Sequence, residues 1–174
     1  AFYKVARLLC LGYPGGPAIS KLAAQGNPDA YPLPRPLAKS KNYNFSYSGL
    51  KTAVLYLLRD LKDQAENEKV KADVAASFQK AAIEVLVNKT IRAAQEFSVT
   101  GILLSGGVSA NKLLREELRI AATETGLPFF CPKIIYTTDN AAMIGAAGYF
   151  KWLRSNHQAV SWKEIRMDAN LRLS

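Results

Sequence analysis

The sequence has few of the residues that bind transition metals or form cross-links. It holds two cysteines, Cys10 and Cys131, and one histidine, His157. The cysteines match no disulfide framework and no zinc spacing, so we expect a reducing, cytoplasmic environment. The histidine lies near no cluster of acidic residues, and a catalytic transition metal needs three protein ligands or more. If this chain contributes to a metal centre, we expect the other ligands to lie outside it.

Long apolar runs are also absent. No stretch is long enough to cross a bilayer, and no charged-then-apolar leader resembles a signal peptide, so we expect no membrane association. The 174 residues, of which 49% are hydrophobic, are enough for one ordinary domain with a real core. Residue 1 is Ala and the chain opens in a helical pattern, "AFYKVARLLCLG". We therefore expect the chain to be a fragment of a longer protein.

Acidic residues are scarce in the first third of the chain. Seven of the 23 basic residues lie within 1–51, whereas only one of the 14 acidic residues, Asp29, lies there. The net charge of the whole chain is +9. A concentrated positive segment attracts a phosphate backbone. An ordinary basic surface with no partner explains the charge equally well.

Apolar spacing, glycines and prolines predict helices in the first hundred residues. Prolines at 28, 32, 34 and 36 predict a long loop that follows the protein surface between the second and third helices. The helices are expected over about 2–11 and 17–25, from near the segment "SYSGLKTA" onward, and over about 70–97. The inward-facing residues of the last two are expected to be Leu50, Val54, Leu57, Leu58 and Leu61, and Val74, Phe78, Ala82, Val85 and Phe97.

From residue 100 the pattern alternates between strands and helices, which is typical of an α/β layer with a largely parallel sheet. The strands are "GILLS" and "PFFCPKIIYT". The helix between them follows "SGGVSAN" and has Leu113, Leu114 and Leu118 on one face. A last helix begins after Asp139 and runs to about Leu153, and the tail "SWKEIRMDANLRLS" has no clear pattern.

Ligand sites in such sheets form where strands end and helices begin. At the first such corner Gly106 and Gly107 let a ligand approach the backbone at a helix N-terminus. Asn111 has donor and acceptor atoms that suit a ribose or an acyl group. The alternative is that the glycines only make the turn and Asn111 only caps the helix. A double glycine alone is a weak signal.

The second corner is "YTTDNAAM", where Asp139 and Asn140 occupy the position of a helix cap. An acidic residue at this position usually only caps the helix. The alternative is that the carboxylate of Asp139 faces a metal or a phosphate. Small residues at Gly145 and Gly148 predict close packing of the helix that follows.

Four segments, in this order, resemble the carboxy-terminal half of the TsaD family, the tRNA threonylcarbamoyladenosine transferases once labelled O-sialoglycoprotein endopeptidases. They are "GYPGGPAISKLA", "NFSYSGLKTA", "LLSGGVSANKLLREEL" and "YTTDNAAMIGAAGYF". The resemblance covers nearly the whole chain and favours ligand contact over a purely structural role at both corners. A metallopeptidase, as in the old label, has no support in these residues.

The resemblance implies the two-lobed actin-like ATPase (ASKHA) fold. Residues 1–174 would form the carboxy-terminal lobe with a helical insertion, with 1–99 mostly helix and loop and 100–174 an α/β layer. The amino-terminal lobe is absent from the chain. Family members transfer threonylcarbamoyl from threonylcarbamoyl-AMP, an ATP-derived nucleotide, to the N6 amine of the adenosine next to the anticodon. The implied partners are tRNA and companion proteins like TsaB and TsaE.

Several residues correspond to functional positions of the family. Asp139 matches a carboxylate ligand of a bound Fe²⁺ or Zn²⁺ ion. Gly16 and Asn111 match positions that contact the nucleotide-bearing substrate, and Gly106 and Gly107 fall on the same nucleotide-side loop. The segment "NFSYSGLK" matches a family signature to which we assign no chemical role.

Two departures from the family pattern matter. Tyr3 stands where the family usually has an aspartate that contacts the substrate ribose, and Cys10 stands where a glycine is usual. The histidine pair that supplies the other metal ligands belongs to the amino-terminal half. We therefore expect half an active site, inactive alone. The alternative is a non-catalytic, degenerate fragment that binds tRNA or a protein partner, which Tyr3 favours.

Overall fold

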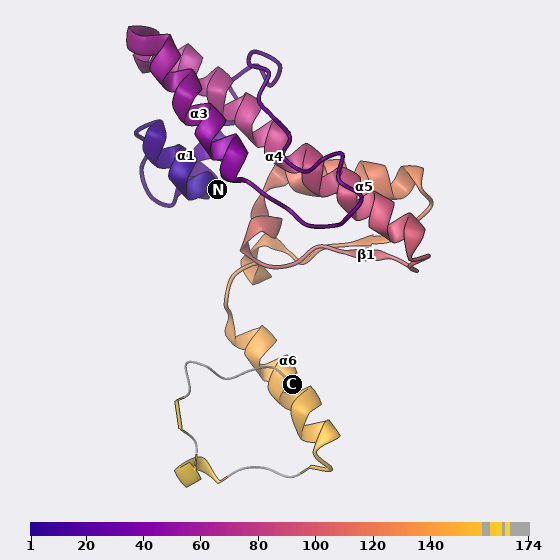
Figure 1. Ribbon diagram of the computed structural model, residues 1–174. Coiled ribbons are helices and arrows are strands. Elements are labelled where there is room, and N and C mark those ends of the chain that lie inside the picture. Colours follow the sequence, from indigo (N-terminus) through magenta and orange to yellow (C-terminus); the bar gives the residue numbers. More distant parts are fainter. Residues whose placement is uncertain (158–160, 165, 168–174) are drawn as a thin grey trace. The chain divides into compact units, whose positions relative to one another are not determined.

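The computed structural model describes residues 1–157, 161–164 and 166–167 (Figure 1). The chain forms two compact units, Ala1–Thr137 and Thr138–Ser174, and each is described by itself. In the tail whose pattern was unclear, residues 165 and 168–174 lie outside the described residues.

The first unit is mostly helical and is built around α4 (Glu68–Glu96), which contributes 14 buried residues. So many buried positions mean that α4 packs on more than one face, unlike a surface helix with a single apolar stripe. Asn67 caps its N-terminus, with the side-chain oxygen accepting from the N–H of Lys69 at 2.8 Å. The other helical elements are α1 (Phe2–Leu8), α2 (Gly15–Ala23), α3 (Ser48–Leu61), η1 (Lys62–Glu66), η2 (Gly107–Ala110), α5 (Lys112–Glu124) and η3 (Ile134–Tyr136).

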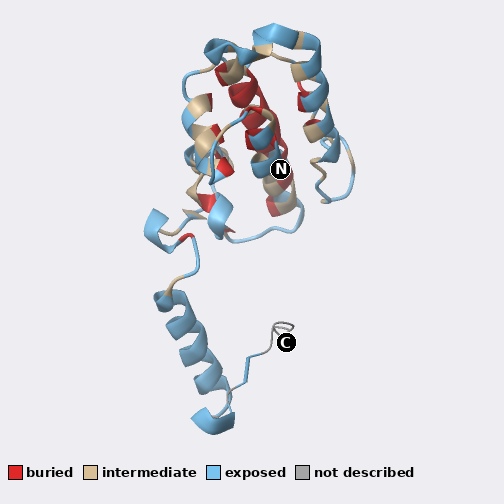
Figure 2. Cartoon of the chain, turned by 90° about the vertical axis from the view of Figure 1, so that its left-hand side faces the viewer, coloured by how far each residue is buried: buried red, intermediate tan, exposed pale blue. Residues whose placement is uncertain are grey.

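The main core lies where α1, α2 and α3 pack on α4, and buried residues gather on these helices (Figure 2). Its largest fully buried side chains include Phe78, Ile19 and Leu50. Two glycines allow the close packing. A Cβ on Gly15 would lie 2.9 Å from the Cβ of Ala6, and one on Gly26 would lie 2.0 Å from the backbone oxygen of Ala72. Larger residues at these positions would push the helices apart.

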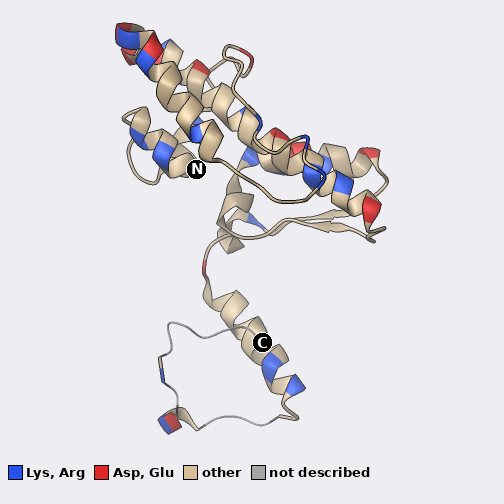
Figure 3. Cartoon of the chain, in the orientation of Figure 1, with Lys and Arg blue, Asp and Glu red and all other residues tan. Residues whose placement is uncertain are grey.

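The proline-marked loop between α2 and α3 is fastened along α4, as its sequence predicts. Tyr31 donates its N–H to Ser77 Oγ at 3.2 Å, and Arg35 pairs with Glu84 at 2.8 Å. Further along, Lys89 Nζ donates to the carbonyl of Asn44 at 2.6 Å. The loop therefore follows α4 toward its C-terminal end (Figure 1), and it carries basic residues of its own (Figure 3).

A two-stranded parallel sheet covers part of the first unit. β1 (Ile102–Leu103) pairs with β2 (Phe129–Phe130), with Ile102 opposite Phe129 and Leu103 opposite Phe130. Ile102 packs against Ala94 of α4 and Ala122 of α5. Leu103 and Phe130 lie on the other face and are exposed. The parallel pairing is confirmed, and within this unit the helices cover one face of the sheet only.

The second strand is shorter than predicted. Pro132 has no N–H to donate to a neighbouring strand, and Ile134–Tyr136 forms a short 3₁₀ helix, η3, instead. The prediction that Phe97 faces inward is wrong, because α4 ends at Glu96 and the Phe97 side chain is 65% exposed. Its ring lies against that of Tyr43, with centroids 5.8 Å apart.

The second unit contains α6 (Ala141–Arg154) and η4 (Trp162–Glu164). None of the residues of α6 is buried. The close packing predicted from its small residues is not seen among the described residues, since a Cβ on Gly145 or Gly148 would meet nothing within 4 Å. In the part of the chain that the structure describes, no helix has the length and apolar character needed to span a membrane.

Candidate functional site

Asn111 lies at the junction of three helices. Its Oδ1 caps α5 by accepting from the N–H of Leu114 at 3.0 Å. Its Nδ2 donates to Ser20 Oγ on α2 at 3.1 Å and to Gln79 Oε1 on α4 at 2.9 Å. Ser20 Oγ also donates to Gln79 Oε1, at 2.8 Å. These three side chains form a closed polar triangle, which we call the Asn111 triangle.

The triangle fixes which atoms of Asn111 remain available. Both amide hydrogens point to protein acceptors, so only the second lone pair of Oδ1 is free to meet a ligand. Gln79 is 7% exposed, so its amide needs these partners. Sequence reasoning missed Ser20 and Gln79. The signal that could have identified Gln79 is a polar glutamine among the apolar residues of α4.

Gly16 lies one turn before Ser20 on α2, so α2 connects it to the Asn111 triangle. As the second residue of the helix, it has an N–H with no partner inside the helix. A Cβ on Gly16 would meet nothing within 4 Å, so packing does not require a glycine here. An open backbone at a helix N-terminus is suited to an anion.

Tyr3 lies beside the start of α2. Its Cα would be 3.0 Å from a Cβ on Gly15, and its ring meets that of Tyr13 edge-on at 6.3 Å. The side chain is 53% exposed. Tyr3 and Gly16 therefore lie at the same end of the pair formed by α1 and α2.

The Gly106–Gly107 turn is held from one side and open on the other. Gly106 has a φ of +80°, which favours glycine, and its carbonyl accepts from both the hydroxyl (2.6 Å) and the N–H (2.9 Å) of Ser109. A Cβ on Gly107 would meet nothing within 4 Å. The turn leads into η2 and then to Asn111.

Arg115 ties this turn to the segment that follows β2. Its Nε donates to the carbonyl of Ser109, its Nη2 to the carbonyl of Pro132 at 2.7 Å, and its Nη1 to Cys131 Sγ at 3.3 Å. This arginine on α5 was not predicted as a site residue. Its hydrogen bonds stabilise the turn, and none of them involves Gly106 or Gly107.

In the second unit, Asn140 and not Asp139 caps α6. Asn140 Oδ1 accepts from the N–H of Met143 at 2.9 Å, and its Nδ2 donates to the carbonyl of Thr138 at 2.8 Å. Asp139 is exposed and makes no hydrogen bond or ion pair with the residues that the structure describes. Its carboxylate is therefore not used by the helix cap.

The described residues do not build a metal site by themselves. Among residues 1–157, 161–164 and 166–167, no group of three or more His, Cys, Asp or Glu side chains is arranged to hold a metal ion. His157 lies against Trp152, with ring centroids 4.2 Å apart. Asp139 is suited to supply one ligand only, so we derive no reaction step through a metal.

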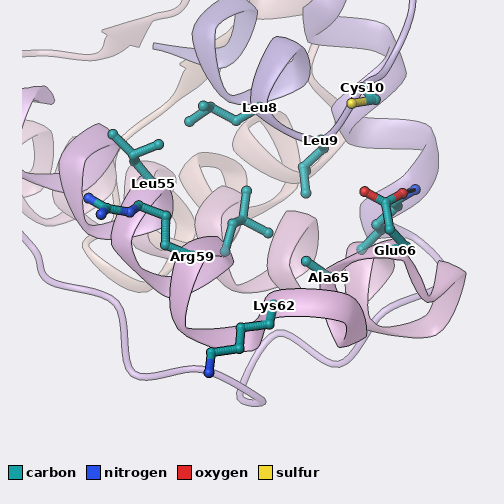
Figure 4. Close-up of a pocket in the computed structure, with 10 residues that line it drawn as sticks. Leu8, Leu9, Cys10, Leu55, Arg59, Lys62, Ala65 and Glu66 are labelled. Atoms are coloured by element: carbon teal, nitrogen blue, oxygen red, sulfur yellow. Dashed lines mark hydrogen bonds and ion pairs between the residues drawn. The ribbon is translucent and has the colours of Figure 1, made fainter.

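A cavity of about 250 Å³ lies beside α1, α3 and η1 and is separate from the Asn111 triangle (Figure 4). Its apolar wall includes Leu8, Leu9 and Leu58, and its polar rim includes Lys71, which pairs with Glu66 at 3.0 Å. None of the predicted site residues lines it.

Comparison with known proteins settles the family. The family model described as "TsaD: tRNA N6-adenosine threonylcarbamoyltransferase" matches residues 1–146. This range includes three of the four resembling segments in full and the fourth as far as Ala146. The chain belongs to the TsaD family. The relationship inferred from the four segments is confirmed.

Similar proteins come from several bacteria. The tRNA N6-adenosine threonylcarbamoyltransferase of Moorella thermoacetica is 51% identical over 165 residues, which are 95% of this chain and 48% of that protein. That of Caldicellulosiruptor saccharolyticus is 49% identical with the same coverage, and that of Thermosipho melanesiensis is 51% identical over 86% of this chain and 44% of its own length. The chain thus spans about half the length of the curated relatives that it matches.

Proposed function

We propose that this chain forms the carboxy-terminal lobe of an actin-like tRNA threonylcarbamoyltransferase. The reaction transfers threonylcarbamoyl from threonylcarbamoyl-AMP to the N6 amine of the adenosine next to the anticodon. The membership of the TsaD family and the names of the relatives support this function. The mostly helical unit with a small parallel sheet is consistent with part of the actin-like fold.

In the proposed reaction the N6 amine attacks the carbamoyl carbon of the mixed anhydride. A C–N bond forms, the C–O bond to the phosphate breaks, AMP leaves, and the amine loses a proton. The residues of this chain act on the nucleotide side. The backbone at Gly16 and Gly107 receives the AMP portion, and Asn111 Oδ1 accepts a hydrogen bond from a ribose hydroxyl.

The Asn111 triangle is the observation that supports this assignment most strongly. Through Ser20 and Gln79 it joins the start of α5 to α2, which carries Gly16 at its own start. Two helix N-termini, each with an open glycine nearby, are thereby connected within one rigid network. Helix N-termini with open glycines are a common solution for binding the phosphate of a nucleotide.

We also propose that Asp139 supplies one ligand of a bound Fe²⁺ or Zn²⁺ ion. The unengaged carboxylate supports this role, and the remaining ligands would come from the absent amino-terminal lobe. When bound, such an ion would supply Lewis-acid chemistry that holds and polarises the carbamoyl group. TsaB-like and TsaE-like proteins would be the companions of the complete enzyme.

The direct test is reconstitution. The chain is mixed with the amino-terminal half of the Moorella thermoacetica relative and with TsaB-like and TsaE-like proteins, and transfer of labelled threonylcarbamoyl to tRNA is measured. We expect transfer by the mixture and none by either half alone. Asn111→Ala should abolish transfer, while Asn67→Ala, which removes a helix cap at the start of α4, should leave it unchanged. Absence of transfer in a stable complex of the two halves would reject the proposed function.

Metal binding is tested in parallel by calorimetry with Zn²⁺. The chain alone should bind no more tightly than its Asp139→Asn variant, because one carboxylate is a weak ligand set. In the two-half complex, Asp139→Asn should weaken binding. Tight stoichiometric binding by the chain alone would contradict this assignment.

A second candidate is a non-catalytic module that binds tRNA. The basic bias of residues 1–51 favours it, and so does Tyr3 at the position where an acidic residue is usual. On this hypothesis the two-half complex binds tRNA without transferring the acyl group, and Tyr3→Asp does not restore transfer.

A further inference from the structure

The loop that precedes α3 is held by a cation without a carboxylate partner. Lys89 is 2% exposed, and its Nζ donates to Ser40 Oγ at 2.8 Å, to the Asn42 carbonyl at 3.1 Å and to the Asn44 carbonyl at 2.6 Å. The centroid of the Phe45 ring lies 5.6 Å from Lys89 Nζ. Three oxygens and a ring face replace the carboxylate that a buried lysine usually requires. We call residues 39–45 the clamped loop.

Arg92, one turn beyond Lys89 on α4, holds the same loop. Its Nη1 donates to the Ser40 carbonyl at 2.9 Å and its Nη2 to the Asn42 carbonyl at 2.8 Å, and the guanidinium lies 4.7 Å from the Tyr43 ring. Its Nε is the one buried side-chain nitrogen or oxygen without a hydrogen-bond partner among the described residues. Two adjacent cations thus fix the loop backbone, and neither forms an ion pair with a residue that the structure describes.

The acidic residues close to the clamped loop are already engaged. Glu84 pairs with Arg35 at 2.8 Å, and Glu96 accepts a hydrogen bond from the hydroxyl of Tyr43. The sequence has no acidic residue from 30 to 59. Lys39 and Lys41 are exposed and take part in no ion pair within the part of the chain that the structure describes. In Figure 3 basic residues are coloured blue on this loop and on the adjacent length of α4. The loop therefore has a local excess of positive charge.

We propose that the clamped loop is an RNA contact surface, with Lys39 and Lys41 binding backbone phosphates. One feature favours RNA over an acidic protein. The two lysines are followed by two aromatic residues, Tyr43 and Phe45, and Phe45, which is 45% exposed, has a ring on which a base can stack. The backbone is also held in place before binding, so little ordering entropy is lost when the phosphates arrive. This inference rests on the proposed function, since it assigns part of the tRNA surface.

The test measures binding of fluorescent tRNA to the chain by anisotropy over a series of salt concentrations. The test variant is Lys39→Ala with Lys41→Ala. The control variant, Lys4→Ala with Lys62→Ala, removes the same charge from exposed lysines on α1 and η1. We expect the test variant to bind on the order of tenfold more weakly at low salt, with the magnitude of the salt slope reduced by about two. The control should retain most of the affinity and the slope.

Equal losses in the two variants would overturn the proposal, because net charge alone would then explain binding. The proposal would also be wrong if the chain bound no tRNA, or if polyglutamate bound equally well and lost affinity in the same variant. The side chains of Lys39 and Lys41 are exposed and form no hydrogen bond or ion pair with the residues that the structure describes, so circular dichroism should show an unchanged fold. The transfer assay is a separate readout. Loop-dependent binding without transfer would reject the proposed function alone, and transfer insensitive to the loop variant would reject this inference alone.

Discussion

Asn111 donates its side-chain amide to Gln79 Oε1 at 2.9 Å and thereby joins the start of α5 to the middle of α4. The same side chain caps α5 through Oδ1. The structural role that the sequence offered as an alternative, a helix cap, is therefore present. It does not compete with the proposed contact to the nucleotide, because the second lone pair of Oδ1 is left over. A residue whose amide is fixed in this way loses little entropy when it meets a ligand.

Asn111→Ala should destabilise the first unit more than the loss of a cap does. A cap is worth about 1 kcal/mol, and loss of the two hydrogen bonds that Asn111 Nδ2 donates to Ser20 and Gln79 adds about 1–3 kcal/mol. Asn67→Ala, which removes the cap of α4 but breaks no such triangle, should cost only about 1 kcal/mol. Chemical denaturation followed by circular dichroism measures both. Equal costs would mean that the triangle contributes nothing to stability.

Acid should weaken the contact between α4 and the loop that follows α2. A hydrogen bond from Lys69 at 2.9 Å, and a second from the N–H of Asn27 at 2.6 Å, hold the pKa of Asp73 below its ordinary value of 3.8. Because the folded-state pKa is lowered, the stabilisation is complete above the ordinary value and is lost as the pH falls through the folded-state pKa.

Asp73→Asn should therefore flatten the dependence of the unfolding free energy on pH below about pH 4. It should also lower stability at neutral pH. Asp60→Asn is the matched control, because Asp60 makes no ion pair among the described residues. Identical acid profiles for the two variants would show that the Asp73 contacts are not formed in solution.

The sequence predicted the helices well because apolar spacing and glycine or proline boundaries are local signals. It also predicted the parallel strand pair and a loop on the surface at the prolines, but not that this loop runs along α4. It missed the shortness of β2, where Pro132 ends the pairing, and the exposure of Phe97, which lies one residue past the end of α4. The Asn111 triangle could not be predicted, since its three members are far apart in sequence and meet only when α2, α4 and α5 pack. The sequence also could not show that the carboxylate of Asp139 is not used in the cap of α6, because either Asp139 or the adjacent Asn140 could have capped the helix.

The two glycines of the turn before η2 should respond differently to alanine. Gly106→Ala places a side chain at a φ of +80°, which costs about 1–3 kcal/mol of stability. Gly107→Ala adds a methyl group to open space and should change stability by about 0.5 kcal/mol or less. If the AMP portion of the substrate approaches this backbone, Gly107→Ala should nevertheless weaken AMP binding by the two-half complex. Calorimetric titration of AMP, together with thermal unfolding, separates the two effects.

Tyr3→Asp should tighten nucleotide binding in the two-half complex. A carboxylate at this position would accept a hydrogen bond from a ribose hydroxyl, and a charge-assisted bond is worth about 1.5–3 kcal/mol, or roughly ten- to hundredfold in affinity. The substitution removes the edge-on contact with Tyr13 but adds an acidic residue to the first turn of α1, which has none. We therefore expect little change in stability, and any change in affinity can be assigned to the ligand.

Arg7 is the residue that decides how large this gain is. It lies one turn further along α1, so its guanidinium can pair with the new carboxylate and compete with the ribose for it. The informative set is therefore AMP affinity for the chain as it is, for Tyr3→Asp, and for Tyr3→Asp with Arg7→Ala, all at one salt concentration. If Arg7 competes, the double variant binds most tightly. If all three bind AMP equally, the opening helix does not reach the ribose. Tyr3 then has no part in the nucleotide site, although it lies beside the start of the helix that carries Gly16.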